Sequence, residues 1–135
     1  GLRSSWENCV REQPEAYATG SDRYFLHESL DVYQRSLQLH ELLDAVWQDD
    51  HIRSRHAKRV DELTTSLTLN IAEGNGRFSH VDHSKFLGIA QDAGTKAAAY
   101  LDLLDPASRL DVERAKSYLR EVMAMLSGLR GYLDE

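Results

Sequence analysis

Residues 67–79 read LTLNIAEGNGRFS, and this short stretch combines side chains that could do chemistry with a glycine-rich break. An amide, a carboxylate and a guanidinium surround two glycines: Asn70, Glu73, Gly74, Gly76 and Arg77. Glycines beside such groups can let backbone N–H groups cradle a phosphate. The stretch lacks, however, the spacing and the Lys-Ser/Thr pair of a Walker loop. We therefore expect a corner of the fold, with ligand binding as the weaker alternative.

Each of these five residues has a structural role at such a corner. Asn70 falls on an apolar helical stripe, and an unpaired buried amide costs about 1–3 kcal/mol, so it should bond to the turning chain or to a neighbouring helix. Glu73 should pair with Arg77 or accept backbone N–H groups at the start of the next helix. Gly74 and Gly76 stand where the end of a helix favours positive φ.

Two histidines follow the corner, and they raise the question of a metal site. His80 and His83 flank Asp82, but no Glu-x-x-His set or cysteine accompanies them. We expect them to lie at the solvated start of a helix. Spacing reveals no Ser/His/Asp set or Cys/His pair either. We therefore expect a protein that is not an enzyme, with no catalytic residue, no metal or other cofactor and no small-molecule substrate.

A single strongly basic segment, HIRSRHAKR at residues 51–59, could contact phosphate groups. Its cationic side chains are Arg53, Arg55, Lys58 and Arg59. The whole chain has a formal charge of −6, unlike a generic nucleic-acid binder. The cluster could also pair with Asp49 and Asp50, and no aromatic residue is interleaved with it for base stacking. A phosphate-binding patch and an ordinary solvated helix start both remain open.

Composition narrows the class of protein. A chain of 135 residues, 41% hydrophobic and 28% charged, is typical of one globular domain with a real core. No apolar run approaches the roughly 20 residues that a membrane span needs. The sequence does not begin with a basic and then apolar leader, and the single cysteine, Cys9, suits a reducing compartment. We expect a cytoplasmic protein without a membrane partner.

Turn-forming residues divide the chain into long segments. The breaks fall near residues 19–22, 49–51, 74–76 and 105–106. They separate an N-terminal extension, residues 1–22, from a domain at 23–135 with four segments of roughly 22–26 residues each. These segments predict an all-α, antiparallel up-down four-helix bundle. Ser79, three residues before Asp82, and Pro106 predict the starts of the third and fourth helices.

Apolar residues at three- and four-residue spacing predict the core-facing sides of the last three helices. The longest such stripe comprises Val112, Ala115, Leu119, Val122, Leu126, Leu129 and Leu133. A second stripe includes Val60, Leu63 and Leu67, and a third runs through Phe86, Ala90, Ala93 and Ala97 with Gly94 alongside. The small residues of the third stripe would let a neighbouring helix approach closely.

The first helix, residues 30–47, carries more apolar residues than a single bundle face requires. They cover about two-thirds of its circumference, whereas a surface helix needs a stripe only a little over 100° wide. The surplus could face the N-terminal extension, an unknown partner or a second subunit. We favour self-association, with Leu39, Leu43 and Val46 at the subunit interface.

The stretch SLTLNIAEGNGRFSHVDHSKFLGIA, residues 66–90, resembles the signature of the 23S rRNA intervening-sequence proteins, also called the S23 ribosomal protein family. That family shows Ser-Ile-x-x-Asn-Ile-Ala-Glu-Gly-x-Gly-Arg and then Phe-x-x-Phe-Leu-x-x-Ala. The matching residues here are Ser66, Asn70, Ile71, Ala72, Glu73, Gly74, Gly76, Arg77, Phe86, Leu87 and Ala90. The resemblance covers about residues 25–133. It departs at Asp92-Ala93-Gly94 and Lys96, where family members often carry Gly-Ser and Glu.

The resemblance implies a four-helix bundle that assembles into a ring, most often a homopentamer, and it implies no defined activity. A related branch, the accessory variability determinant of diversity-generating retroelements, is strongly basic and binds nucleic acid and a reverse transcriptase. Our leading hypothesis is a non-enzymatic, self-associating member of the intervening-sequence family. The alternative is an accessory factor that binds RNA, DNA or a reverse transcriptase through a basic patch repeated around the ring.

Overall fold

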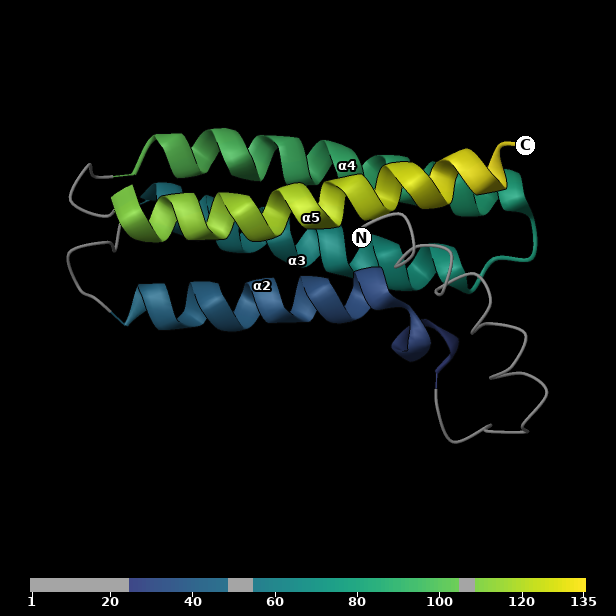
Figure 1. Cartoon of the computed structure of the whole chain (residues 1–135), viewed down its shortest axis with the longest axis horizontal. Helices are drawn as coiled ribbons and strands as arrows, with labels where there is room; N and C mark the ends of the chain where they lie inside the picture. Colours follow the sequence, from purple (N-terminus) through teal and green to yellow (C-terminus); the bar gives the residue numbers. More distant parts are fainter. Residues whose placement is uncertain (1–24, 49–54, 105–108) are drawn as a thin grey trace.

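A computed structural model describes residues 25–48, 55–104 and 109–135 of the chain. Its long helices are α2 (Asp31–Trp47), α3 (Arg55–Asn75), α4 (His80–Asp102) and α5 (Arg109–Leu133), and a 3-10 turn, η1 (Leu26–Ser29), precedes them. The helices lie side by side and alternate in direction (Figure 1). The predicted all-α, antiparallel up-down four-helix bundle is confirmed. The N-terminal extension at 1–22, Arg53 and Pro106 lie outside the described residues.

Around the bundle, α2 contacts α3 and α5, while α4 contacts α3 and α5. The contact between α3 and α4 is the most extensive, and these two helices form a hairpin. The short η1 turn packs against α2 and α3. Within the described ranges, no helix has the length and apolarity needed to cross a bilayer.

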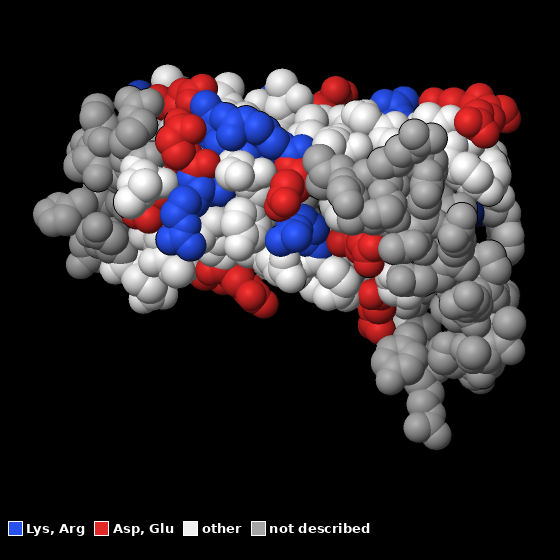
Figure 2. All heavy atoms as spheres, in the orientation of Figure 1, with Lys and Arg blue, Asp and Glu red and all other residues white. Residues whose placement is uncertain are grey.

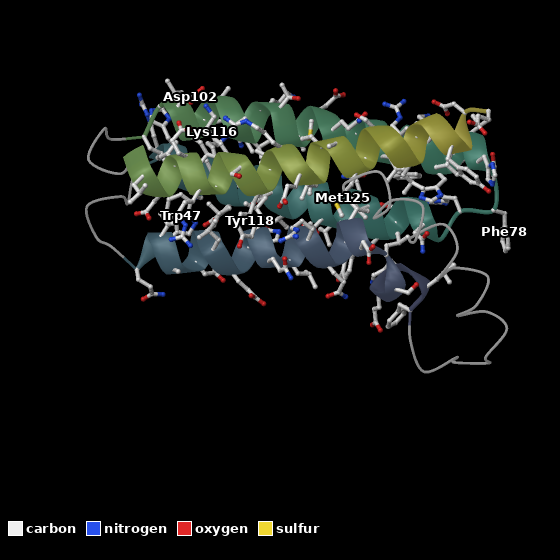
Figure 3. The ribbon with its side chains drawn as sticks, in the orientation of Figure 1. Trp47, Phe78, Asp102, Lys116, Tyr118 and Met125 are labelled. Atoms are coloured by element: carbon white, nitrogen blue, oxygen red, sulfur yellow. The ribbon has the colours of Figure 1, made fainter. Side chains whose placement is uncertain are left out.

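The face of the bundle shown in Figure 2 mixes acidic and basic side chains. On this face Lys116 Nζ of α5 lies 2.7 Å from Asp102 Oδ1 of α4 (Figure 3). Arg35 Nε of α2 likewise lies 3.4 Å from Glu121 Oε2 of α5. Exposed ion pairs of this kind contribute up to about 1 kcal/mol each. They link neighbouring helices. Acidic and basic side chains are mixed, so the described part of this face has no extended patch of a single charge sign.

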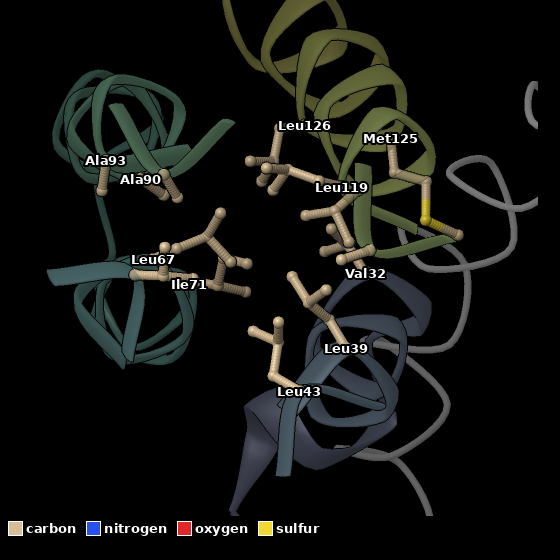
Figure 4. Close-up of a cluster of buried hydrophobic side chains, with 14 of the residues drawn as sticks. Val32, Leu39, Leu43, Leu67, Ile71, Ala90, Ala93, Leu119, Met125 and Leu126 are labelled. Carbon is tan, nitrogen blue, oxygen red and sulfur yellow. The ribbon is translucent and has the colours of Figure 1, made fainter. Parts of the chain in front are cut away.

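The centre of the bundle is filled by apolar side chains from all four helices (Figure 4). Leu67 and Ile71 of α3 and Leu126 of α5 point into this centre, and all three are fully buried. The predicted α5 stripe is confirmed, since all seven of its residues are buried. On α3 the buried face is shifted from the predicted stripe, because Leu63 is only half-buried while Thr64 is 1% exposed. The sequence reading missed Thr64 because a threonine does not register as apolar.

The structure corrects the predicted subunit interface on α2. Leu39, Leu43 and Val46 are 1%, 1% and 7% exposed within a single chain, so they belong to the bundle core. The wide apolar arc of α2 has an intramolecular cause, because this helix packs against α3, α5 and η1 at once. Tyr33, Leu42 and Trp47, at the edges of the arc, are half-buried against the same core.

Polar side chains fix how α2 lies against α3. His40 Nε2 lies 3.1 Å from the Thr64 carbonyl oxygen and 2.9 Å from Thr68 Oγ1. Near the other end of α2, the Trp47 indole donates to Asp61 Oδ1 at 2.6 Å. Sliding α2 along α3 would leave these partly buried groups unpaired, at a cost of about 1–3 kcal/mol for each. The contacts therefore select one register between the two helices.

Close approach between helices depends on Gly94 of α4. A Cβ atom at this position would lie 2.6 Å from Met123 Sδ and 3.1 Å from Leu67 Cδ1. Leu67 is fully buried, so it has little room to move. The predicted small-residue surface of this helix therefore has a specific function, which is to let α3 and α5 meet α4 at Gly94.

We predict that Gly94→Val destabilises the fold by about 1–3 kcal/mol, because the added methyl groups overpack the core. The measurement is the free energy of unfolding from a urea titration followed by circular dichroism. Gly131→Ala is the matched control. An added Cβ at Gly131 meets open space, so this variant should keep or slightly raise stability. A Gly94→Val protein as stable as the wild type would contradict the packing described for Gly94.

Candidate functional site

The glycine-rich motif forms the corner between α3 and α4. Helix α3 ends at Asn75, and α4 begins at His80 after a short turn. The Gly76 N–H donates to the Glu73 carbonyl oxygen at 3.2 Å, and the Arg77 N–H donates to that of Gly74 at 3.0 Å. These bonds satisfy carbonyl groups that the helix end would otherwise leave free.

The start of α4 is capped as the sequence predicts. The Ser79 hydroxyl accepts a hydrogen bond from the Asp82 N–H at 3.3 Å, and Ser79 has the extended backbone of an N-cap. The Asp82 carboxylate lies in the first turn of α4, where it complements the helix dipole. The turn and the first turn of α4 therefore pair these backbone groups within the chain.

Arg77 closes the outside of this corner. Its Nη2 lies 2.9 Å from Glu73 Oε1, which confirms the predicted pair. Its guanidinium carbon lies 4.7 Å from the centre of the Phe86 ring, in cation–π geometry. Arg77 is thus engaged by both helices, and one of its partners is an aromatic residue that the sequence did not connect with it.

Asn70 does not lie where the sequence placed it. Its Nδ2 group donates to the Ser66 carbonyl oxygen at 2.8 Å, one turn back along α3, and not to the turning chain or to another helix. Asn70 is half-buried, beside the core stripe and not within it. With Ser66 and Glu73 it forms a polar row at three- and four-residue spacing along α3, and Arg77 follows in the turn.

The role expected of the two glycines also needs correction. Neither Gly74 nor Gly76 adopts the positive φ that a helix end often requires. Gly74 is needed for space instead, because a Cβ there would lie 2.8 Å from Phe86 Cβ and 3.2 Å from His83 Cδ2. A Cβ atom at Gly76 would meet only the Glu73 carbonyl oxygen, at 3.5 Å. The constraint at Gly74 comes from α4, so local sequence rules could not reveal it.

His83 is the buried titratable group of the corner. We expected a solvated side chain, but His83 is 5% exposed and packs under Gly74. Burial, assisted by the neighbouring His80, lowers the pKa of His83 to about 4. Its Nε2 has no hydrogen-bond partner among the described residues. Those residues also contain no group of three or more His, Cys, Asp or Glu side chains that could hold a metal ion.

We predict that acid destabilises the bundle through His83. Its pKa lies below the value of about 6.5 expected in the unfolded chain, so protons bind the unfolded state more tightly. Stability is therefore retained above pH 6.5 and is lost as the pH falls toward 4, by roughly 2–3 kcal/mol. Urea titrations at pH 7 and pH 4.5 measure this loss.

The matched variants are His83→Leu and His80→Leu. His83→Leu should remove most of the acid-dependent loss, whereas His80→Leu removes an exposed histidine and should retain most of it. An equal loss in His83→Leu and in the wild type would show that carboxylates, and not His83, account for the acid sensitivity.

The basic cluster lies at the opposite end of the hairpin, on the first turns of α3. Arg55 and Lys58 are exposed, and no ion pair joins either of them to another residue in the described part of the chain. Arg59 pairs with Glu62 on the same helix. Its guanidinium carbon lies 5.7 Å from the centre of the Tyr100 ring. Tyr100 and Glu62 raise the pKa of Arg59 above its usual value, so this residue remains cationic.

Tyr100 is the residue that sequence reasoning missed at this end. The sequence around the basic cluster contains no aromatic side chain, but α4 brings half-buried Tyr100 to within 5.9 Å of the His56 ring, between ring centres, as well as beside Arg59. The antiparallel register that sets Gly94 against Leu67 also sets Tyr100 against the start of α3. If the residues of the two predicted helices are paired outward from the corner, Tyr100 falls opposite the basic cluster.

Comparison with models of known protein families and with curated proteins finds no match for this sequence. The resemblance to the intervening-sequence family therefore stays a prediction. The geometry provides two candidate regions on the α3–α4 hairpin: a self-capped corner with aromatic and apolar neighbours, and a basic end with an adjacent aromatic ring.

Proposed function

We propose that this chain is a non-enzymatic, cytoplasmic four-helix-bundle protein of the 23S rRNA intervening-sequence type, which acts as a self-associated ring, most simply a homopentamer. The observation that carries this proposal is an exposed apolar surface on the α3–α4 hairpin. It comprises Leu69, Phe78, Val81 and Ile89. Their exposed fractions are 61% for Leu69, 99% for Phe78, 77% for Val81 and 42% for Ile89. We refer to these four residues as the hairpin surface.

The position of the hairpin surface supports its use between subunits. Phe78 projects from the end of the bundle at the α3–α4 corner (Figure 3). Leu69 of α3 and Ile89 of α4 lie further from the corner along the two helices. Single exposed apolar residues are common, but four large ones on one hairpin supply apolar area that a protein interface could bury. With α2 engaged in the core, this hairpin is the part of the bundle best suited to meet a second copy.

We predict that light scattering gives a mass near five times 15.3 kDa for the wild-type protein. The double variant Leu69→Glu/Ile89→Glu should lower this mass to that of a monomer, because it places charges in a desolvated contact. Leu110→Glu is the control, since Leu110 is 77% exposed on α5, away from the hairpin. A wild-type monomer at micromolar concentration would refute self-association, and equal effects of the two substitutions would refute the hairpin as its surface.

A second candidate function is an accessory factor that binds RNA, DNA or a reverse transcriptase. The contact of Tyr100 with Arg59 and His56 favours it, because an aromatic ring beside cationic groups can stack on a base while the cations meet phosphates. The exposed side chains of Arg55 and Lys58 add charge, and no ion pair engages either of them within residues 25–48, 55–104 and 109–135. A ring of subunits would repeat this basic end and raise the avidity of weak contacts.

We predict for this second function that single-stranded RNA binding weakens by about 20-fold per protomer between 50 and 200 mM salt, as expected for three phosphate contacts. The triple variant Arg55→Glu/Lys58→Glu/Arg59→Glu should abolish binding in a fluorescence anisotropy titration. Lys85→Glu/Lys96→Glu/Arg120→Glu changes the net charge equally at other exposed positions and should retain most of the affinity. Binding that is absent, or insensitive to salt, would exclude this function.

A further inference from the structure

Arg130 is a half-buried cation on α5 whose partners are neutral. Its Nε donates to Ser84 Oγ at 3.1 Å, and its Nη1 donates to Gln91 Oε1 at 2.7 Å. Both partners belong to α4, which lies beside α5 (Figure 1). In the part of the chain that the structure describes, no carboxylate pairs with Arg130, whereas Arg35, Arg59, Arg77 and Lys116 each have one.

The guanidinium of Arg130 is seated on Gly88 of α4. A Cβ atom at Gly88 would lie 3.1 Å from Nη1, 3.2 Å from Cζ and 3.3 Å from Nη2 of Arg130. Because these distances are nearly equal, the guanidinium lies flat over the Gly88 backbone. Any larger residue would press on this group. The fold thus fixes the plane of the guanidinium by two hydrogen bonds and one glycine.

A second polar group lies at the edge of this arrangement. Gln91 bridges from Arg130 to α5, because its Nε2 donates to Ser127 Oγ at 3.1 Å. Ser127 is exposed, and its hydroxyl hydrogen remains available because the oxygen is the acceptor in this bond. The guanidinium packs on Gly88, and Arg130 is only half-buried. Solvent can therefore reach this part of α5.

We propose that Arg130 and Ser127 form a binding site for an oxyanion, such as a phosphate or a carboxylate group. The Nη2 amino group of Arg130 has no partner among the described residues, and a guanidinium binds planar or tetrahedral oxyanions through two parallel N–H donors. The partial negative charge at the carboxyl end of α5 offsets the positive charge of Arg130 only in part. This site is separate from the hairpin surface and from the basic end of α3. Its test therefore does not depend on the proposed function.

The test uses the NMR signal of the Arg130 Nε–H group, whose hydrogen bond to Ser84 slows its exchange with water. Sodium phosphate and sodium acetate are titrated separately into the full-length protein at constant ionic strength. A saturable shift of this signal with phosphate, or with both anions, supports the site. No shift, or an equal non-saturating shift of the Arg120 signal, would overturn the proposal.

Two variants keep the test independent of folding. Gly88→Ala retains the charge and favours the helix, but it displaces the guanidinium, and the dissociation constant should rise about tenfold. Ser127→Ala should weaken binding of the same anions at an exposed position, and Ser117→Ala, another exposed serine of α5, is its control. Wild-type affinity in both Gly88→Ala and Ser127→Ala would also overturn the proposal.

Discussion

The close packing of α3 against α4 is the constraint on which the rest of the structure depends. It is possible because Gly74 and Gly94 lack side chains where the helices come together, with Phe86 and Leu67 filling the space. Interdigitated contacts of this kind allow little sliding, because any shift would move Phe86 and Leu67 off the glycines and against larger residues. The hairpin therefore has one register, and this register places every contact between the two helices.

Both candidate regions of the hairpin follow from that register. At the corner, it sets Arg77 over Phe86 and buries His83 beneath Gly74. At the far end, it carries Tyr100 to Arg59 and His56. Each end thus combines an arginine, Arg77 of the turn or Arg59 of α3, with an aromatic ring of α4. The hairpin gains its polar and aromatic surface from the same packing that holds its helices together.

The remaining helices complete the core and determine which surfaces stay outside. Because α2 meets α3, α5 and η1, its apolar residues are used within the chain, whereas Leu69, Phe78, Val81 and Ile89 of the hairpin stay exposed. Helix α5 buries its full apolar stripe and contributes Arg130 to the seam with α4. The neutral partners of Arg130 hold its position without cancelling its charge, in contrast to the ion pairs elsewhere on the bundle.

Local sequence features were enough to predict the helical elements of this protein. Periodic spacing located α5 and its seven buried residues, the glycine break located the corner, and Ser79 and the Glu73–Arg77 pair followed from local rules, because each depends on residues within about one helical turn. What each element faces depends on how the helices pack against one another. In the structure Leu39 lies in the core and Gly74 is needed for close packing. His83 is buried, and Tyr100 lies beside Arg59. These outcomes depend on contacts between segments far apart in the sequence, and a helical period does not specify which neighbour a face will meet.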